Sequence, residues 1–190
     1  MPREIVLARH GETEWSRDLR HTGRTDVPLT EHGREQAAAL APRLAGREFS
    51  AVLVSPLGRA VETCELAGLG ASAERRPELM EVDYGSAEGL TTEQIRATTP
   101  GWTVWTHHTP GAETLEQVGE RLAPLVAELA SGDGGDGDVA IFAHGHILRI
   151  LAALWIEQPP HGGARLALQT GRLSALGWER ETRCIRAWNT

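Results

Sequence analysis

The stretch Ile5-Val-Leu-Ala-Arg-His-Gly-Glu-Thr-Glu-Trp15 decides the fold of this chain. Its first four residues are apolar in succession, which is typical of a strand buried on both faces of a parallel sheet. Arg9, His10 and Gly11 follow at once. In such sheets ligands bind beyond the carboxyl ends of the strands, so a cation and an imidazole at this point indicate a binding site.

Two later strands end in the same chemistry. Residues 51–54 run into Ser55-Pro56 and a helix that carries Arg59, and residues 139–143 run into His144-Gly145. Strands that alternate with helical spacing predict an α/β fold: a single domain with a mostly parallel central sheet and helices on both faces. The expected helices cover residues 31–44 (kinked or ended early by Pro42), 57–66, 92–97, 114–130 and 147–155.

The remaining segments are less regular. A weak strand is expected at 71–74, and late strands at 165–168, 173–178 and 184–187. Residues 131–137, rich in glycine and aspartate, predict a flexible surface turn. Residues 81–113 are rich in Gly, Thr, Pro and Trp and predict a cap-like excursion from the core of a single domain spanning 1–190.

Composition excludes several classes of protein. A formal net charge of −7 argues against a general nucleic-acid binder. Apolar runs stay well below the roughly 18 residues that span a bilayer, and Met1–Glu4 lead into the first strand without a signal-peptide core. Cys64 and Cys184, far apart, fit reduced thiols. We therefore expect a cytoplasmic protein without membrane or nucleic-acid partners; the sequence leaves a homodimer open.

Two guanidinium groups and two imidazoles at one sheet edge suit a phosphoryl group. The arginine fork matches phosphate oxygens, and one histidine can attack phosphorus while the other holds the transferring oxygens. The departing oxygen needs a proton, for which Glu81 and Asp83 are the nearby candidates. The expected substrate is a small phosphorylated metabolite.

With these motifs in order, the chain resembles the histidine phosphatase superfamily, also called the phosphoglycerate mutase-like family. Residues 84–90 and 111–113 further resemble small bacterial acid phosphatases and fungal sedoheptulose-bisphosphatase-like enzymes. The matching residues are Arg9-His10-Gly11-Glu12-Thr13; Leu29-Thr30 with Gly33 and Gln36-Ala37; Ser55-Pro56-Leu57 with Arg59-Ala60 and Glu62-Thr63; Glu81 with Gly85 and Glu88-Gly89; and His144-Gly145 with Arg149.

The resemblance implies a role for each matching residue. His10 becomes phosphorylated, Arg9, Arg59 and His144 hold the phosphate, and Glu81 rather than Asp83 donates the proton. His144 also counts as catalytic.

Three further positions follow from the same comparison. Ser16 stands where the family commonly has Asn, and its hydroxyl can still contact phosphate. Thr22 and Gly23 match positions that approach the substrate through a hydroxyl and a backbone amide.

The implied enzyme is a phosphoric monoester hydrolase of the histidine acid phosphatase type that uses neither metal nor cofactor. Three alternatives stay open. One is a cofactor-dependent phosphoglycerate mutase, and another a non-catalytic relative that binds phospho-ligands. The third is a metal site at His144 and His146, for which the sequence offers no completing ligand cluster.

Overall fold

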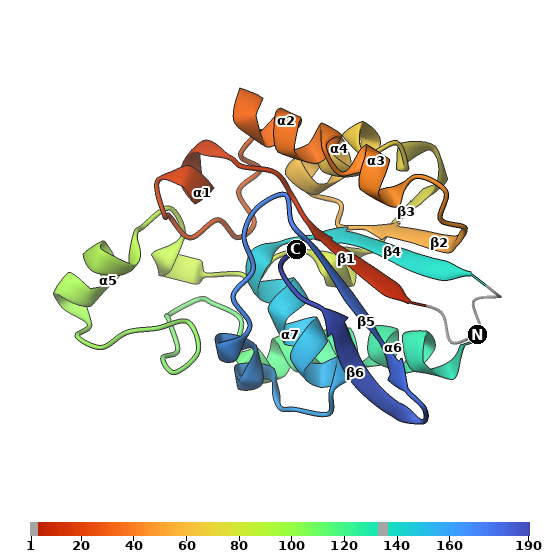
Figure 1. The fold of residues 1–190 in the computed structure, drawn as a ribbon. Coiled ribbons are helices and arrows are strands. Elements are labelled where there is room, and N and C mark those ends of the chain that lie inside the picture. Colours follow the sequence, from red (N-terminus) through yellow and green to blue (C-terminus); the bar gives the residue numbers. More distant parts are fainter. Residues whose placement is uncertain (1–3, 133–136) are drawn as a thin grey trace.

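A six-stranded mixed sheet forms the centre of the computed structural model, which describes residues 4–132 and 137–190 (Figure 1). The strand order is β3-β2-β4-β1-β5-β6. Strands β3, β2, β4 and β1 are parallel, and β5 and β6 continue the sheet antiparallel. The strands are β1 (Ile5–Arg9), β2 (Phe49–Val54), β3 (Ala73–Arg75), β4 (Asp138–Ala143), β5 (Leu173–Glu179) and β6 (Thr182–Ala187).

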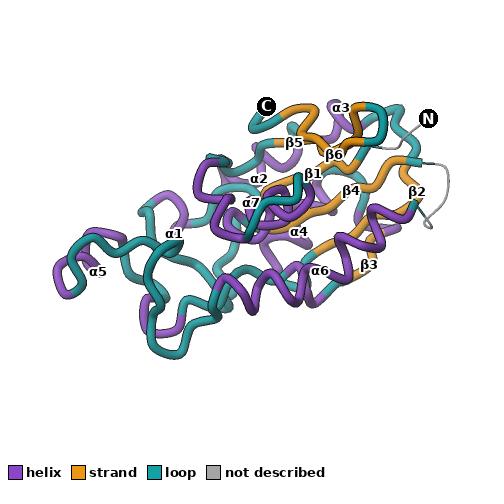
Figure 2. The backbone as a smooth tube through the Cα atoms, turned by 90° about the horizontal axis from the view of Figure 1, so that it is seen from below, coloured by secondary structure: helices purple, strands orange, loops and turns teal. Residues whose placement is uncertain are grey.

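Helices cover both faces of this sheet (Figures 1 and 2). On one face lie α2 (Glu31–Ala38), α3 (Ala41–Leu44) and α4 (Gly58–Leu66). On the other lie α6 (Leu115–Ser131) and α7 (Gly145–Trp155). The predicted α/β fold with a mostly parallel sheet is confirmed.

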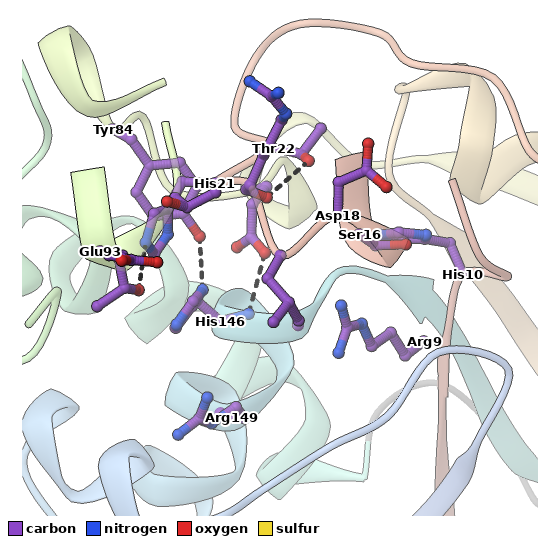
Figure 3. A pocket seen from close by; sticks show the side chains of 16 residues that line it. Arg9, His10, Ser16, Asp18, His21, Thr22, Tyr84, Glu93, His146 and Arg149 are labelled. Carbon is purple, nitrogen blue, oxygen red and sulfur yellow. Dashed lines mark hydrogen bonds between the residues drawn. The ribbon is translucent and has the colours of Figure 1, made fainter. Parts of the chain in front are cut away.

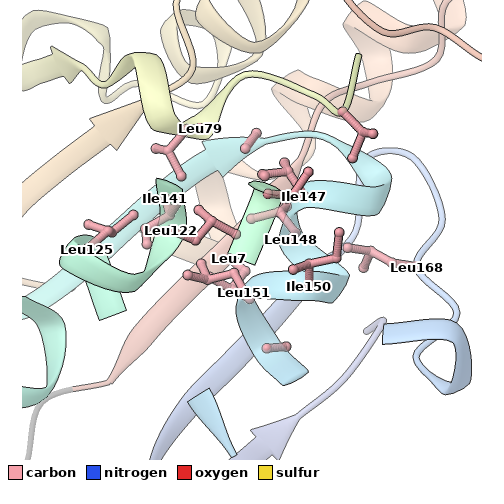
Figure 4. Close-up of a cluster of buried hydrophobic side chains, with 14 of the residues drawn as sticks. Leu7, Leu79, Leu122, Leu125, Ile141, Ile147, Leu148, Ile150, Leu151 and Leu168 are labelled. Carbon is pink, nitrogen blue, oxygen red and sulfur yellow. The ribbon is translucent and has the colours of Figure 1, made fainter. Parts of the chain in front are cut away.

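The central strands β1 and β4 are apolar along most of their length because their side chains alternate between two cores. Ile5 and Leu7 of β1 join the larger core with α6 and α7, and Val6 and Ala8 join the smaller core with α3 and α4. Figure 4 shows the larger core, where Leu122, Ile141 and Leu151 are at most 1% exposed. Two-sided burial makes β1 and β4 firm supports for the groups at their ends.

Local signals in the sequence account for where three of the helices begin. The side chain of Thr30 caps α2, and Thr114 and Thr91 form capping boxes at α6 and at α5 (Thr92–Thr98). The helix expected over 31–44 ends at Ala38 and resumes as α3, which carries Pro42 in its first turn. The expected effect of Pro42 is thus seen as a break.

One predicted strand is wrong. Residues 160–165 form a short 3₁₀ helix, η4 (Pro160–Arg165), and 166–168 continue as a loop where a strand was expected from 165. Two prolines and two glycines just before this segment favour a turn, and the Leu168 carbonyl accepts a hydrogen bond from Arg9 instead of a strand partner. Of the expected turn at 131–137, residues 133–136 lie outside the described part of the chain.

Residues 81–113 leave the sheet after β3 and return at α6. They contain η3 (Gly85–Ala87) and α5, which projects away from the sheet in Figure 1. Trp102, 3% exposed, packs this segment onto the larger core. Among the described helices, none is long and apolar enough for a membrane span.

Candidate active site

A cavity of about 560 Å³ opens at the carboxyl ends of β1 and β4 (Figure 3). Arg9 and His10 form one side of it, and His21, Tyr84 and His146 form the other. The full lining is Arg9, His10, Ser16, Asp18, Leu19, Arg20, His21, Thr22, Glu81, Tyr84, Thr91, Thr92, Glu93, Gly145, His146 and Arg149.

His10 is placed as a nucleophile. Its Nδ1 lies 2.7 Å from the carbonyl oxygen of Gly11, so Nδ1 carries the proton and donates it to that oxygen. Burial, then Arg59 and Arg9, hold the pKa of His10 well below its usual value. The ring is therefore neutral at neutral pH, and its Nε2 keeps a lone pair.

The turn after His10 is fixed by close backbone packing. A Cβ on Gly11 would lie 2.1 Å from the carbonyl oxygen of Gly33 on α2, so this position requires glycine. The Gly11 N–H donates to Thr63 Oγ1 at 3.1 Å, and the Glu12 N–H donates to Gln36 Oε1 at 2.9 Å. These contacts hold Gly11, whose carbonyl accepts the His10 proton, against α2 and α4.

Arg59 is buried and Arg9 half-buried, and both lie near His10. Arg9 Nη1 donates to the Leu168 carbonyl. The terminal nitrogens of Arg59 donate to carbonyl oxygens of the loop 22–25, at 2.8 Å to Gly23 and 2.9 Å to Thr25. Arg59 thus also anchors the loop on which the substrate-facing positions were predicted.

His144 lies next to His10, with 5.2 Å between ring centroids. Its Nε2 is 2.7 Å from Ser55 Oγ, and burial is the main cause that holds its pKa well below the usual value. In the described part of the chain, three buried side-chain nitrogens lack a hydrogen-bond partner: Nε of Arg9, Nε of Arg59 and Nδ1 of His144. All three belong to the predicted phosphate site.

Glu81, 4% exposed, lies at the N-terminus of α7. Its carboxylate accepts three backbone N–H groups at 2.9 Å, from Val82 and Ile147 at Oε1 and from His146 at Oε2. These bonds fix the carboxyl group against the first turn of α7. Oε2 accepts one of these bonds and so has capacity left toward the cavity that Glu81 lines.

The other predicted contacts are partly engaged within the protein. Ser16 lines the cavity, and its hydroxyl donates to the Thr13 carbonyl at 3.0 Å. Thr22 lines it too, and its hydroxyl donates to the Arg20 carbonyl at 3.3 Å. The Gly23 N–H donates to Glu88 at 3.2 Å. Their contacts with substrate stay predictions.

The wall opposite the phosphate site was mostly missed from sequence. Tyr84 Oη lies 2.5 Å from Nδ1 of His146, and the His21 ring packs 5.1 Å from the Tyr84 ring. The Trp105 ring lies 5.1 Å from the His146 ring. The Arg149 guanidinium lies over the Trp105 ring, 4.5 Å from its centroid. The aromatic residues within 84–105 were the sequence feature that could have indicated this wall. Their contact partners, however, come from other segments of the chain.

The two histidines of the metal alternative have separate partners. His144 bonds Ser55 through Nε2, whereas His146 bonds Tyr84 through Nδ1. Over residues 4–132 and 137–190, no group of three or more His, Cys, Asp or Glu side chains is placed to hold a metal ion. The geometry thus gives no support to a site shared by His144 and His146.

Comparisons with known proteins identify the family of this chain. Residues 5–190 match the histidine phosphatase superfamily (branch 1). An acid phosphatase of Mycobacterium tuberculosis is 43% identical over 182 residues, 94% of this chain and 88% of the relative. A sedoheptulose 1,7-bisphosphatase of Saccharomyces cerevisiae is 31% identical over 79% of this chain and 66% of its own.

Structural similarity extends over nearly the whole chain. The solved structure of an open reading frame product of Mycobacterium tuberculosis superimposes with a TM-score of 0.90 at 40% identity, covering 98% of this chain and 97% of that chain. Relatives named probable phosphoglycerate mutase, such as that of Cronobacter sakazakii, are 26% identical over 97% of this chain and 89% of their own. The chain belongs to the histidine phosphatase superfamily, branch 1.

Proposed function

We propose that this protein is a metal-independent phosphatase that hydrolyses small phosphomonoesters through a phosphohistidine at His10. One observation carries the proposal: three buried nitrogens without a partner among the described residues, on Arg9, Arg59 and His144, belong to side chains beside a neutral histidine whose Nε2 keeps its lone pair. Buried N–H donors without acceptors are costly, and a phosphoryl group supplies acceptor oxygens for them.

The reaction runs in two steps. In the first, Nε2 of His10 forms a bond to phosphorus as the bond to the ester oxygen breaks, and Glu81 gives its proton to the departing alkoxide. In the second, a water attacks the phosphohistidine and passes a proton to Glu81, which frees inorganic phosphate and His10. The backbone donors around Glu81 hold its carboxyl group in place for both steps.

The same residues can run a mutase, and relatives with that name support this second candidate. A mutase must keep the phosphohistidine from water while the intermediate turns over in the pocket. Here about sixty residues separate Glu81 from His144, and α6 takes seventeen of them. The remaining segment forms one wall of the cavity, which favours release of phosphate to water.

The deciding experiment assays both activities on the purified protein. Phosphate release from 3-phosphoglycerate and a panel of phosphomonoesters is measured beside interconversion of 2- and 3-phosphoglycerate, with 2,3-bisphosphoglycerate as primer. We expect release to dominate, to persist after treatment with a chelator, and to need no added metal. Efficient interconversion with negligible free phosphate would overturn the proposal. A cytoplasmic location and a homodimer also remain predictions.

A further inference from the structure

Ser55 contacts the ring of His144 through its hydroxyl. It directly follows β2, is 0% exposed, and its backbone N–H donates to the Phe142 carbonyl at 2.9 Å. Its hydroxyl lies 2.7 Å from Nε2 of His144, and Oγ also takes the Leu57 N–H at 3.4 Å. The serine oxygen is thus held in place from the strand end.

The direction of this hydrogen bond follows from counting donors and acceptors. A neutral imidazole has one N–H and one lone pair, and burial holds the pKa of His144 well below its usual value. If Nε2 carried the proton, two buried groups would lack partners among the described residues: the Ser55 hydroxyl hydrogen and the Nδ1 lone pair. If Nδ1 carries it, Ser55 donates to Nε2, and one group remains, the Nδ1 N–H.

That remaining N–H is the one a phosphoryl oxygen would accept. Within residues 4–132 and 137–190, Nδ1 of His144 lacks a partner, as do Nε of Arg9 and Nε of Arg59, and the rings of His144 and His10 are 5.2 Å apart. His10 offers a contrast, because its Nδ1–H is taken by the Gly11 carbonyl and its lone pair is left free. Both rings thus carry the proton on Nδ1, one to attack phosphorus and the other to donate to its oxygens.

We propose that Ser55 is a positioning residue for the phosphatase reaction, whose hydroxyl donates to Nε2 of His144 and holds that ring in the Nδ1–H tautomer for a phosphoryl oxygen. The inference rests on the proposed function for its catalytic consequence. The state of the ring can be measured whether or not the protein turns over substrate.

The first test reads the tautomer in the unaltered protein. Two-bond ¹H–¹⁵N correlation on ¹⁵N-histidine-labelled protein near pH 7.5, with His144→Asn used to assign the signals, reports which ring nitrogen carries the proton. We expect a protonated Nδ1 and an unprotonated Nε2 on His144. A protonated Nε2 would overturn the proposal without any need for a variant.

The second test compares matched variants with p-nitrophenyl phosphate as substrate. Ser55→Ala removes the hydroxyl, and we expect kcat/KM to fall about 10- to 100-fold, below the loss for removing a transition-state donor outright, because the ring itself remains. Ser55→Thr keeps a hydroxyl and should restore part of the rate. Ser174→Ala is the control: Ser174 is also buried, lies on β5 and bonds the Asn189 N–H. It should stay within about twofold of the unaltered protein.

The third test separates the two nitrogens of the ring. The amide nitrogen of asparagine lies near the place of Nδ1, and that of glutamine near Nε2. His144→Asn should therefore keep more activity than His144→Gln, and adding Ser55→Ala to His144→Asn should cost little. The proposal would be overturned if Ser55→Ala lowered activity equally in the unaltered protein and in His144→Asn. Unchanged activity of Ser55→Ala alone would also overturn it. An unaltered protein that binds vanadate but turns over no phosphomonoester would instead contradict the proposed function.

Discussion

The two sides of the cavity are built in different ways. On the phosphate side, His10 lines the cavity and the fully buried His144 lies beside it; they directly follow the adjacent strands β1 and β4, which are buried on both faces. On the opposite side, Tyr84 comes from the irregular segment 81–113, and His21 comes from the loop after β1. Trp105, from the same irregular segment, packs against His146 without lining the cavity itself.

This difference assigns the two sides to different parts of the reaction. Groups that follow strands of the sheet are held tightly, which suits the invariant phosphoryl group. Groups on loops carried by a rigid scaffold can differ between related enzymes and suit the variable leaving group. Changes on the phosphate side should therefore affect every substrate, and changes on the opposite wall should depend on the leaving group.

Replacing His10 should have the largest effect. His10→Ala removes the nucleophile, and we expect turnover to fall by at least about a thousandfold for every phosphomonoester. Steady-state kinetics with several leaving groups check this. A variant that keeps most of its activity, or that loses it for some esters alone, would break the assignment of His10 to the invariant step.

Replacing Glu81 should affect substrates according to their leaving group. Glu81→Gln keeps the shape but cannot donate a proton as a carboxylic acid does, so turnover of alkyl phosphates should fall roughly a hundredfold or more. Aryl phosphates need less protonation and should suffer less. The test is to measure turnover of alkyl and aryl phosphates side by side with Glu81→Gln. Equal slowing of both classes would show that Glu81 is not the acid of the first step.

The neutral histidines of the phosphate side predict a pH dependence of stability. Burial is the main cause that lowers the pKa of His10 and of His144 in the folded state. Between the unfolded pKa, about 6.5, and the lower folded value, the unfolded chain binds protons that the folded chain does not. Stability from these groups is therefore complete above about pH 6.5 and falls as pH drops below it, by about 1.4 kcal/mol per pH unit for each.

Urea unfolding at pH 7.5, 6.5 and 5.5 measures this slope. His144→Asn should reduce it by about one histidine's share, whereas His161→Asn, at an exposed position of η4, should keep it. A slope that His144→Asn leaves unchanged would show that the phosphate side does not hold this ring neutral.

The smallest effect is expected on the opposite wall. Tyr84→Phe removes the hydroxyl that bonds His146, and we expect a change of about three- to tenfold in kcat/KM that differs between leaving groups, as one hydrogen bond is worth about 1 kcal/mol. Inhibition by vanadate, which reports the phosphate side, should stay within about twofold. A parallel loss of vanadate binding would remove the division between the two walls.

The same division explains what the sequence could predict. His10 and His144 were accessible because a short apolar run, a histidine and a glycine can be recognised locally, and parallel strands align their ends. Ser55 stood in a matching motif, but its contact with His144 joins residues 89 positions apart. The hydrogen bond between Tyr84 and His146 spans 62 positions, and no periodic pattern in the sequence predicts it. The false strand at 165–168 has this cause only in part: the Leu168 carbonyl accepts its hydrogen bond from Arg9, which is distant in the chain, whereas the prolines and glycines before the segment are a local signal.

The most direct test of the account is the site of phosphorylation. The protein is mixed with p-nitrophenyl phosphate, quenched in alkali within milliseconds to preserve phosphohistidine, digested and mapped by mass spectrometry. We predict a phosphoryl group on the Nε2 atom of His10, which is absent from His10→Ala and present in His144→Asn at a lower rate of formation. Turnover without any phosphorylated His10, or a phosphoryl group on His144 instead, would contradict the account.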